Sequence, residues 1–340
     1  MSVSHPKFLA AAVQHASIMH DVHAGIDKAV EIINEAGRAD VELLVFPEAW
    51  IPGYPYWAWL GPPVWGMQFV QAYHDNSIER DSPELQRIAD AAKRNSMHVV
   101  LGYSERVGGT LYLAQSLFSS DGEVIAHRRK LRPTHVERTI YGDGDGSNLA
   151  VHDTALGKLG ALCCWEHLQP LSKYAMYSMG EQVHAAAWPT LSLYQGKAYA
   201  LGPEANRAAS QVYALEGQCF VLAATSVMTQ DIHDTLAVTS EQAELIPLGG
   251  GASAIFGPDG TPLGEPVPHD REGLVIAELD LSDITLAKAA ADPAGHYARP
   301  DVTKLLLNRE PNPPVEMMSP VMMEKAEAAV DAADSPDESL

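Results

Sequence analysis

Three segments that have the character of buried strands each end in a side chain capable of acid–base or nucleophilic chemistry. Glu48 follows the run 45–47, Lys130 follows the second arm of a predicted hairpin, and Cys164 follows the run 160–163. A thiol has a reference pKa near ~8.5, so a nearby ammonium would favour its thiolate and a nearby carboxylate could accept its proton. Sites in layered α/β folds collect at strand ends. The three groups therefore form a chemically complete set for thiol catalysis without a histidine.

Each of these residues also has a more ordinary interpretation when it is taken alone. A buried cysteine is usually a small hydrophobic residue, and Glu and Lys at strand ends are usually solvated. Neighbouring residues on a strand point to opposite faces, so spacing does not choose between Cys163 and Cys164 as the nucleophile. At this level both thiols remain candidates.

The composition restricts the possible partners and compartments. The chain has 340 residues and a formal net charge of -21, and an acidic surface repels nucleic acid and anionic membranes. The apolar stretch 8–13 is short and has no basic segment before it, so it predicts a first strand and no signal peptide. No apolar run approaches the ~20 residues of a membrane span. Three cysteines, two of them adjacent, suit a reducing compartment, and we expect a cytoplasmic protein.

Apolar periodicity predicts strands and helices that alternate along the chain. The predicted strands are residues 8–14, 42–48, 98–103, 112–118, 124–129, 160–164, 183–188, 219–224, 252–256 and 274–279, and the predicted helices are residues 22–39, 82–95, 171–180 and 204–216. The segment 50–65 is rich in Trp, Tyr, Pro and Gly and is predicted to be a wide loop. The pattern indicates a mixed α/β protein in layers, with helices packed outside buried sheets.

The domain organisation follows from where the composition changes. No shift divides the chain before residue ~310, so we predict a single domain over residues 1–310. The tail, residues 311–340, is rich in Pro, Met, Ala and acidic residues, and such a composition predicts disorder.

Several aromatic side chains are placed where they could line a substrate pocket. Tyr54 follows Glu48 closely, Trp165 adjoins the candidate thiols, and Trp188 ends another predicted strand. For most other aromatic residues of the segment 50–65, packing within the loop is an equally good interpretation. His296 is predicted at the pocket edge or at an interface.

Two sequence patterns resemble parts of known metal-binding sites but lack residues that such sites require. Cys163, Cys164 and His167 lack the second, separated ligand pair that zinc usually takes. The segment 143–146 resembles the start of a calcium loop, but Asn148 occupies the position where that loop needs glycine. We predict no bound metal.

Motifs in one order along the chain resemble those of the nitrilase family, which belongs to the carbon-nitrogen hydrolase superfamily. They comprise Phe46-Pro47-Glu48, Pro52-Gly53-Tyr54-Pro55, Arg129-Lys130-Leu131, Pro133-Thr134-His135-Val136-Glu137-Arg138, Cys164-Trp165-Glu166-His167, Glu181-Gln182-Val183-His184, Ala214-Leu215-Glu216-Gly217-Gln218 and Gly295-His296-Tyr297. Within the family the chain is most similar to bacterial arylacetonitrilases, notably in the segments 162–167 and 170–175.

The resemblance implies a fold, a reaction and a set of site residues. It implies an α-β-β-α sandwich, no cofactor, and a catalytic triad of Glu48, Lys130 and Cys164, with Glu137 as a second glutamate. Cys164 then becomes the nucleophile. The implied reaction converts a nitrile and two waters to a carboxylic acid and ammonia, with arylacetonitriles such as phenylacetonitrile or mandelonitrile as expected substrates.

The resemblance leaves rival functions and an assembly state to consider. An aliphatic or cyanide-hydrolysing relative would carry the same triad, and an amidase of the superfamily is a further alternative. Nitrilases resemble spiral filament formers, so we expect a homo-oligomer, with residues 57–80 and 225–249 as candidate interface insertions. A filament-forming protein without catalysis is the alternative from a different class.

Overall fold

The computed structural model describes residues 5–313, 315 and 323. The predicted disorder of the tail 311–340 therefore falls almost entirely outside the described residues. By its internal contacts the chain divides into Met1–Arg309 and Glu310–Leu340, and the two sheets and all eight α-helices described below lie in the first unit. No helix among the described residues is long and apolar enough to cross a membrane.

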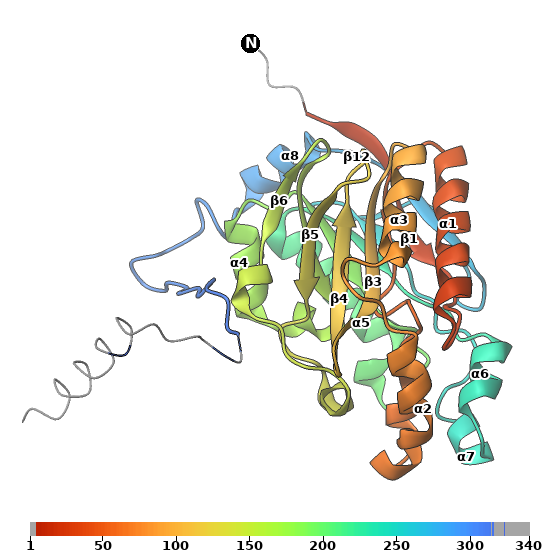
Figure 1. The fold of residues 1–340 in the computed structure, drawn as a ribbon. Coiled ribbons are helices and arrows are strands. Elements are labelled where there is room, and N and C mark those ends of the chain that lie inside the picture. Colours follow the sequence, from red (N-terminus) through yellow and green to blue (C-terminus); the bar gives the residue numbers. More distant parts are fainter. Residues whose placement is uncertain (1–4, 314, 316–322, 324–340) are drawn as a thin grey trace, which may run out of the picture. The chain divides into compact units, whose positions relative to one another are not determined.

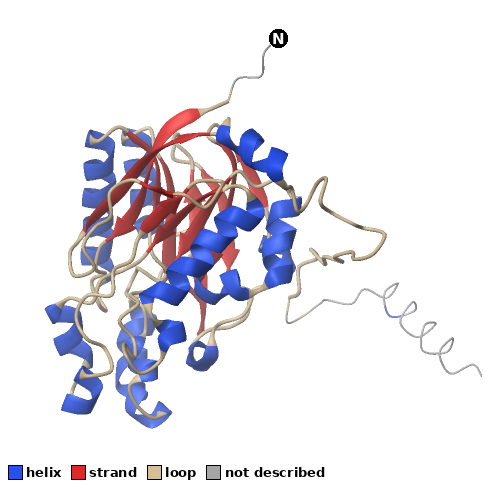
Figure 2. Cartoon of the chain, turned by 180° about the vertical axis from the view of Figure 1, so that it is seen from behind, coloured by secondary structure: helices blue, strands red, loops and turns tan. Residues whose placement is uncertain are grey.

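In the described part of the chain, two six-stranded sheets pack face to face and helices cover their outer faces (Figures 1 and 2). The first sheet has the order β12 (Gly273–Asp280), β1 (Lys7–Gln14), β2 (Val41–Val45), β3 (His98–Val107), β4 (Thr110–Phe118) and β5 (Val124–Arg129). The second has the order β11 (Pro262–Leu263), β10 (Ala254–Phe256), β9 (Phe220–Ala224), β8 (Val183–Ala187), β7 (Gly157–Cys163) and β6 (Val151–Thr154). The predicted α-β-β-α sandwich is confirmed.

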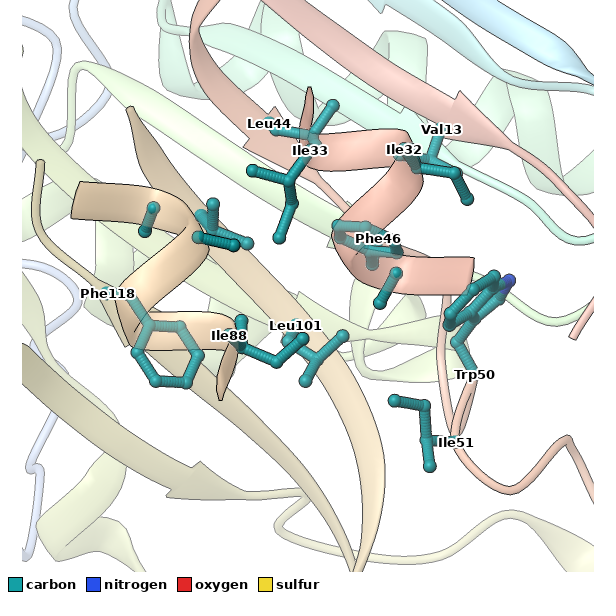
Figure 3. Close-up of a cluster of buried hydrophobic side chains, with 14 of the residues drawn as sticks. Val13, Ile32, Ile33, Leu44, Phe46, Trp50, Ile51, Ile88, Leu101 and Phe118 are labelled. Atoms are coloured by element: carbon teal, nitrogen blue, oxygen red, sulfur yellow. The ribbon is translucent and has the colours of Figure 1, made fainter. Parts of the chain in front are cut away.

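The outer face of the first sheet is covered by α1 (Val22–Arg38) and α3 (Pro83–Arg94). Asp21 caps α1 by accepting a hydrogen bond from the Ala24 amide at 2.9 Å. The buried residues of α1, which include Ile26, Ala29 and Ile33, recur at the three- and four-residue spacing that turns one stripe toward the sheet. Figure 3 shows this core with Val13, Leu44, Phe46, Leu101 and Phe118 meeting the two helices.

Strand alternation divides the residues of the central strands between two cores. In β1, Ala10 and Ala12 lie between the sheets, whereas Ala11 and Val13 face the helices, as the two-residue period of a strand requires. The second sheet is covered in the same way by α4 (Pro170–Ser178) and α5 (Pro203–Gly217).

Several elements were absent from the prediction, and the reasons are local. The segment 50–65, predicted as a loop, contains a 3₁₀ turn, η1 (Tyr56–Trp59), and the start of α2 (Pro63–Asp75). Val64, Met67 and Val70 of α2 are exposed while Tyr73 is buried, so its apolar residues form no single stripe to recognise. The remaining unpredicted strand and α-helices are β6, α6 (Gln230–Leu236), α7 (Ser240–Ala243) and α8 (Asp283–Ala290), and each is short.

The carboxyl ends of strands from both sheets meet just beyond β2. The Glu48 amide donates a hydrogen bond at 3.2 Å to the carbonyl of Trp188, the residue that follows β8. Gly102 of β3 lies against this turn, and a Cβ at position 102 would lie 3.0 Å from the Pro47 carbonyl carbon and 3.1 Å from Glu48 Cα. A residue without a side chain is therefore required beside the turn that carries Glu48.

Gly102→Ala tests this requirement. Because the added methyl overlaps backbone that cannot move freely, we expect a loss of about 1–3 kcal/mol in the free energy of unfolding, together with lower activity from a displaced Glu48. Urea unfolding measures the stability. Gly109→Ala is the matched control, since a Cβ at position 109 meets no atom within 4 Å. Equal free energies of unfolding for the two variants would show that position 102 does not require glycine.

Candidate active site

A buried ammonium lies between two buried carboxylates. Lys130 Nζ donates to Glu48 Oε1 at 2.9 Å and to Glu137 Oε2 at 2.8 Å, and the side chains of all three residues are at most 1% exposed. Burial lowers the pKa of Lys130, but the charges of Glu137 and Glu48 outweigh it and raise that pKa well above its ordinary value. The lysine therefore stays protonated, as a group that stabilises negative charge must.

Glu48 is suited to accept a proton. Burial raises its pKa to about 8, Lys130 opposes the rise, and the negative charge of Glu137 adds to it. Its second oxygen, Oε2, is buried and has no hydrogen-bond partner among the described residues. A carboxylate with a raised pKa and an unused oxygen has the properties of a general base.

Glu137 is held by donors from several elements. It lies in the 3₁₀ turn η2 (His135–Thr139), where the Thr134 amide donates to its Oε2 at 2.6 Å. The Tyr54 hydroxyl donates to Oε1, also at 2.6 Å. With Lys130 these donors fix both oxygens of Glu137, which in turn fixes the position of the ammonium.

Cys164 begins the 3₁₀ turn η4 (Cys164–Leu168), immediately after β7. Its φ of 46° lies in the left-handed region, a conformation that costs a non-glycine residue about 1–3 kcal/mol and is concentrated at functional sites. Burial and the charge of Glu48 raise the thiol pKa well above its ordinary value, against the opposing effects of Lys130 and a hydrogen bond from the Trp165 amide. The resting thiol is therefore protonated and needs a base to become a nucleophile.

A further buried carboxylate, Glu166, which the sequence did not single out, fixes the turn. Glu166 receives two hydrogen bonds from Arg128, at 2.8 and 2.9 Å, and further ones from the amides of Leu131 and Cys163. Burial opposes its ionisation, but Arg128 outweighs burial and lowers the pKa of Glu166. This carboxylate therefore ties the Cys164 turn to the residue after Lys130. Its position three residues after Cys163, as in a capping box, was the available sequence signal.

A cavity opens at Cys164. Its lining is mainly aromatic and aliphatic, with a few polar groups, and comprises Tyr54, Tyr56, Trp59, Thr134, Glu137, Cys164, Trp165, Pro189, Thr190, Leu191, Leu193, Leu201 and Asn206. The indole of Trp165 is held by a hydrogen bond of 3.0 Å to Asn206 Oδ1. Asn206 and the other lining residues from 189 to 206 were not predicted, because neither type nor spacing marks them.

The structure places two of the predicted pocket residues elsewhere. Trp188 is stacked on His167 at 4.9 Å between ring centroids, and its Nε1 donates to Ser210, so its indole packs behind the Cys164 turn. His296 is exposed, and its ring contacts Tyr297. Neither residue lines the cavity. Tyr54 and Trp165 do line it.

The residues that evoked a metal site serve other contacts. The Cys163 thiol lies 3.6 Å from Arg128 Nη1, and His167 Nδ1 lies 2.6 Å from the Cys164 carbonyl oxygen. Within the described residues no group of three His, Cys, Asp or Glu side chains converges as metal ligands would.

Fold and site together define a class: a layered α/β hydrolase with a thiol, a carboxylate and an ammonium at its strand ends. The family model described as carbon-nitrogen hydrolase matches residues 9–289. The chain belongs to this family and, within it, to the nitrilases, as predicted. It is therefore a hydrolase that acts on carbon-nitrogen bonds.

Curated relatives and solved structures agree with this assignment. The chain is 50% identical to an arylacetone-specific nitrilase of Alcaligenes faecalis over 96% of its length and 93% of that protein. It is 51% identical to an aliphatic nitrilase of Rhodococcus rhodochrous, covering 91% of this chain and 84% of that one. A carbon-nitrogen hydrolase structure from Helicobacter pylori shares the fold at a TM-score of 0.70 and 18% identity, over 87% of this chain and 97% of that one.

The raised pKa of Glu48 predicts the pH dependence of activity. Glu48 accepts the thiol proton only when ionised, so we expect kcat/KM to rise with pH along a limb near 8 instead of near the ordinary glutamate value of 4.5.

The folded protein also keeps a proton on Glu48 that the unfolded chain releases above its ordinary pKa. Stability from this group should therefore fall as pH rises from 4.5 to about 8.

Initial rates across pH and urea unfolding measure the two effects. Glu137→Gln is the informative comparison, because it removes a negative charge that raises the pKa of Glu48 and should move the limb to lower pH. A wild-type limb at the ordinary glutamate pKa would contradict the assignment of Glu48 as base.

Proposed function

We propose that this nitrilase hydrolyses arylacetonitriles, such as phenylacetonitrile or mandelonitrile, to the carboxylic acid and ammonia. The observation that supports this preference is the aromatic wall beside Cys164, formed by Tyr54, Tyr56, Trp59 and Trp165. Flat aromatic side chains pack favourably against an aryl group. Identity of 50% to an arylacetone-specific nitrilase supports the same preference.

The proposed chemistry uses the triad and two waters. Glu48 Oε2 takes the thiol proton as Cys164 Sγ attacks the nitrile carbon, and the proton passes to the nitrile nitrogen to give a thioimidate. Water adds to the thioimidate carbon, the carbon-nitrogen bond breaks, and ammonia leaves a thioester. A second water, deprotonated by Glu48, attacks the thioester, and the carboxylic acid and the free thiol are formed.

Lys130 and Glu137 have distinct roles in this proposal. The Lys130 ammonium stabilises the negative charge that develops on the substrate, a contribution whose loss typically costs ~3 kcal/mol or more at comparable sites. Glu137 positions that ammonium, and the Tyr54 hydroxyl in turn positions Glu137. All groups in the scheme are protein side chains and water, so it requires no cofactor.

The proposal extends to the oligomeric assembly of the protein and to its cellular compartment. We infer one catalytic domain over residues 1–310 in a cytoplasmic, spiral homo-oligomer, and the three free cysteines suit a reducing compartment. The two candidate insertions contact one another, since Gln242 Nε2 donates to the Leu60 carbonyl at 3.1 Å. The first insertion presents exposed Val64 and Met67, apolar side chains that suit a contact between copies.

Paired substitutions of the adjacent cysteines test the nucleophile. We expect Cys164→Ala to lower kcat by more than about 10³-fold, because the covalent step is lost. Cys163→Ala should keep most of the activity, since that thiol is buried against Arg128. Mass spectrometry of enzyme quenched during turnover should place the acyl adduct on the peptide that contains Cys164. The opposite pattern would make Cys163 the nucleophile, and unchanged activity in both variants would refute the enzyme mechanism.

A panel of nitriles tests the substrate class. Ammonia release should be faster from phenylacetonitrile and mandelonitrile than from aliphatic nitriles of similar size or from cyanide. An aliphatic nitrilase is the second candidate, because relatives from Rhodococcus rhodochrous named for that activity are 51% and 48% identical to the chain. Rapid turnover of cyanide with none of phenylacetonitrile would overturn the proposal. Ammonia release from phenylacetamide but not from its nitrile would indicate an amidase.

A further inference from the structure

Behind the Cys164 turn lies a buried chain of hydrogen bonds that the proposed chemistry does not use. Tyr213 of α5 donates to Glu181 Oε2 at 2.6 Å, and Glu181 Oε1 lies 2.6 Å from His184 Nδ1. His184 Nε2 lies 2.9 Å from His167 Nε2, and His167 Nδ1 lies 2.6 Å from the Cys164 carbonyl oxygen. All four side chains are at most 1% exposed. We call this set the histidine relay.

The geometry determines the direction of each hydrogen bond when both rings are neutral. A carbonyl oxygen only accepts, so His167 Nδ1 must carry the proton and its Nε2 must be an acceptor. His184 Nε2 must then donate, which leaves His184 Nδ1 as an acceptor. Glu181 Oε1 must therefore be protonated and donate to it.

The electrostatic environment agrees with this assignment. Burial lowers the pKa of His167 and of His184 well below the ordinary value, and the positive charge of Arg128 adds to the lowering. Burial raises the pKa of Glu181 to about 8, and the hydrogen bond from Tyr213 opposes that rise. A neutral chain is the favoured state of such a desolvated set.

Packing holds the relay in one arrangement. The rings of His184 and Tyr213 are stacked at 3.9 Å between centroids, and His167 is stacked on Trp188. Gly160 of β7 leaves the space that the Glu181 carboxyl occupies, because a Cβ at position 160 would overlap Glu181 Oε1. Close packing of this kind leaves each ring one orientation.

The relay ends on the peptide that joins Cys164 to Trp165. A trans peptide is planar, so its carbonyl and its N–H point in opposite directions. His167 holds the carbonyl on the buried side, which directs the Trp165 amide toward the Cys164 sulfur, where it donates a hydrogen bond. Cys164 has a positive φ, and such a conformation persists where the surroundings fix it.

We propose that Glu181, His184 and His167 are positioning residues that hold the Cys164–Trp165 peptide so that its amide faces the reacting sulfur and the charge developing beside it. The proposal rests on the proposed function, because it concerns the tetrahedral steps of that reaction. The three residues touch no substrate and act through the backbone of the nucleophile.

Two substitutions of equal size at Glu181 test the relay. Gln keeps a donor for His184 and an acceptor for Tyr213, so Glu181→Gln should retain near-native kcat. Glu181→Met fills the same space without either hydrogen bond, and we expect kcat to fall about 10- to 100-fold as the Trp165 amide loses its alignment. KM should stay within about twofold, as for an interaction made only in the transition state.

A second pair of substitutions tests His167, at the other end of the relay. His167→Asn keeps an N–H close to where Nδ1 lies and should restore most of the kcat that His167→Leu loses. Cys219→Ala is the control for packing, since it removes a buried atom from the same core cluster and leaves every relay hydrogen bond in place. It should lower the melting temperature without changing kcat.

A measurement on the wild-type protein keeps the test decisive if a variant fails to fold. In a ¹⁵N spectrum of histidine-labelled enzyme, assigned with His167→Asn, His167 should be protonated at Nδ1 and His184 at Nε2. An imidazolium signal from either ring, or loss of kcat in Glu181→Gln equal to that in Glu181→Met, would overturn the neutral relay. The tautomers of His167 and His184 are measured without substrate. If the wild-type protein hydrolysed no nitrile, the proposed function would be refuted, but the measured tautomers would still support the neutral relay.

Discussion

The site depends on the cost of removing charge from water. An isolated ammonium as deeply buried as Lys130 would lose its proton, because desolvation opposes the charged form. Glu48 and Glu137 offset that cost, with one hydrogen bond each at 2.9 and 2.8 Å. Burial also raises the pKa of Glu48 to about 8, with a smaller contribution from the charge of Glu137, although Lys130 opposes the rise. The burial that makes the lysine depend on its partners therefore also gives one of these partners the raised pKa expected of a general base.

Two buried glutamates behind the nucleophile show how environment gives one residue type opposite states. Glu166 faces Arg128 and two backbone amides, and its pKa is lowered. Glu181 faces a tyrosine hydroxyl and a neutral histidine, and its pKa is raised. Glu166 connects the Cys164 turn to β5, the strand before Lys130, through its ion pair with Arg128. Glu181 supports the same turn through hydrogen bonds between neutral groups. Both act on the backbone around Cys164, whose positive φ needs such support.

The sequence was most informative where chemistry and strand periodicity coincide. Glu48, Lys130 and Cys164 each end a strand-like run, and their convergence follows from the way strand ends meet in layered sheets. Residue types alone left Cys163 and Cys164 equivalent, and only family motifs separated them. Glu166 and Glu181 were not singled out, because what defines them is a partner distant in sequence. Arg128 is 38 residues from Glu166, and Tyr213 is 32 residues from Glu181. Local sequence patterns do not indicate contacts between residues so distant along the chain.

Trp188 shows why a position at a strand end does not by itself identify a pocket residue. Its place at a strand end suggested a pocket role, yet its indole packs on His167 behind the nucleophile. The cavity walls come instead mainly from Tyr54–Trp59, from the segment 189–201 and from Asn206 near the start of α5. The candidate catalytic groups therefore lie at strand ends, whereas most of the cavity lining lies on connecting segments, which tolerate change more readily. Substrate preference can change with these segments while the buried set of Glu48, Lys130 and Cys164 stays as it is.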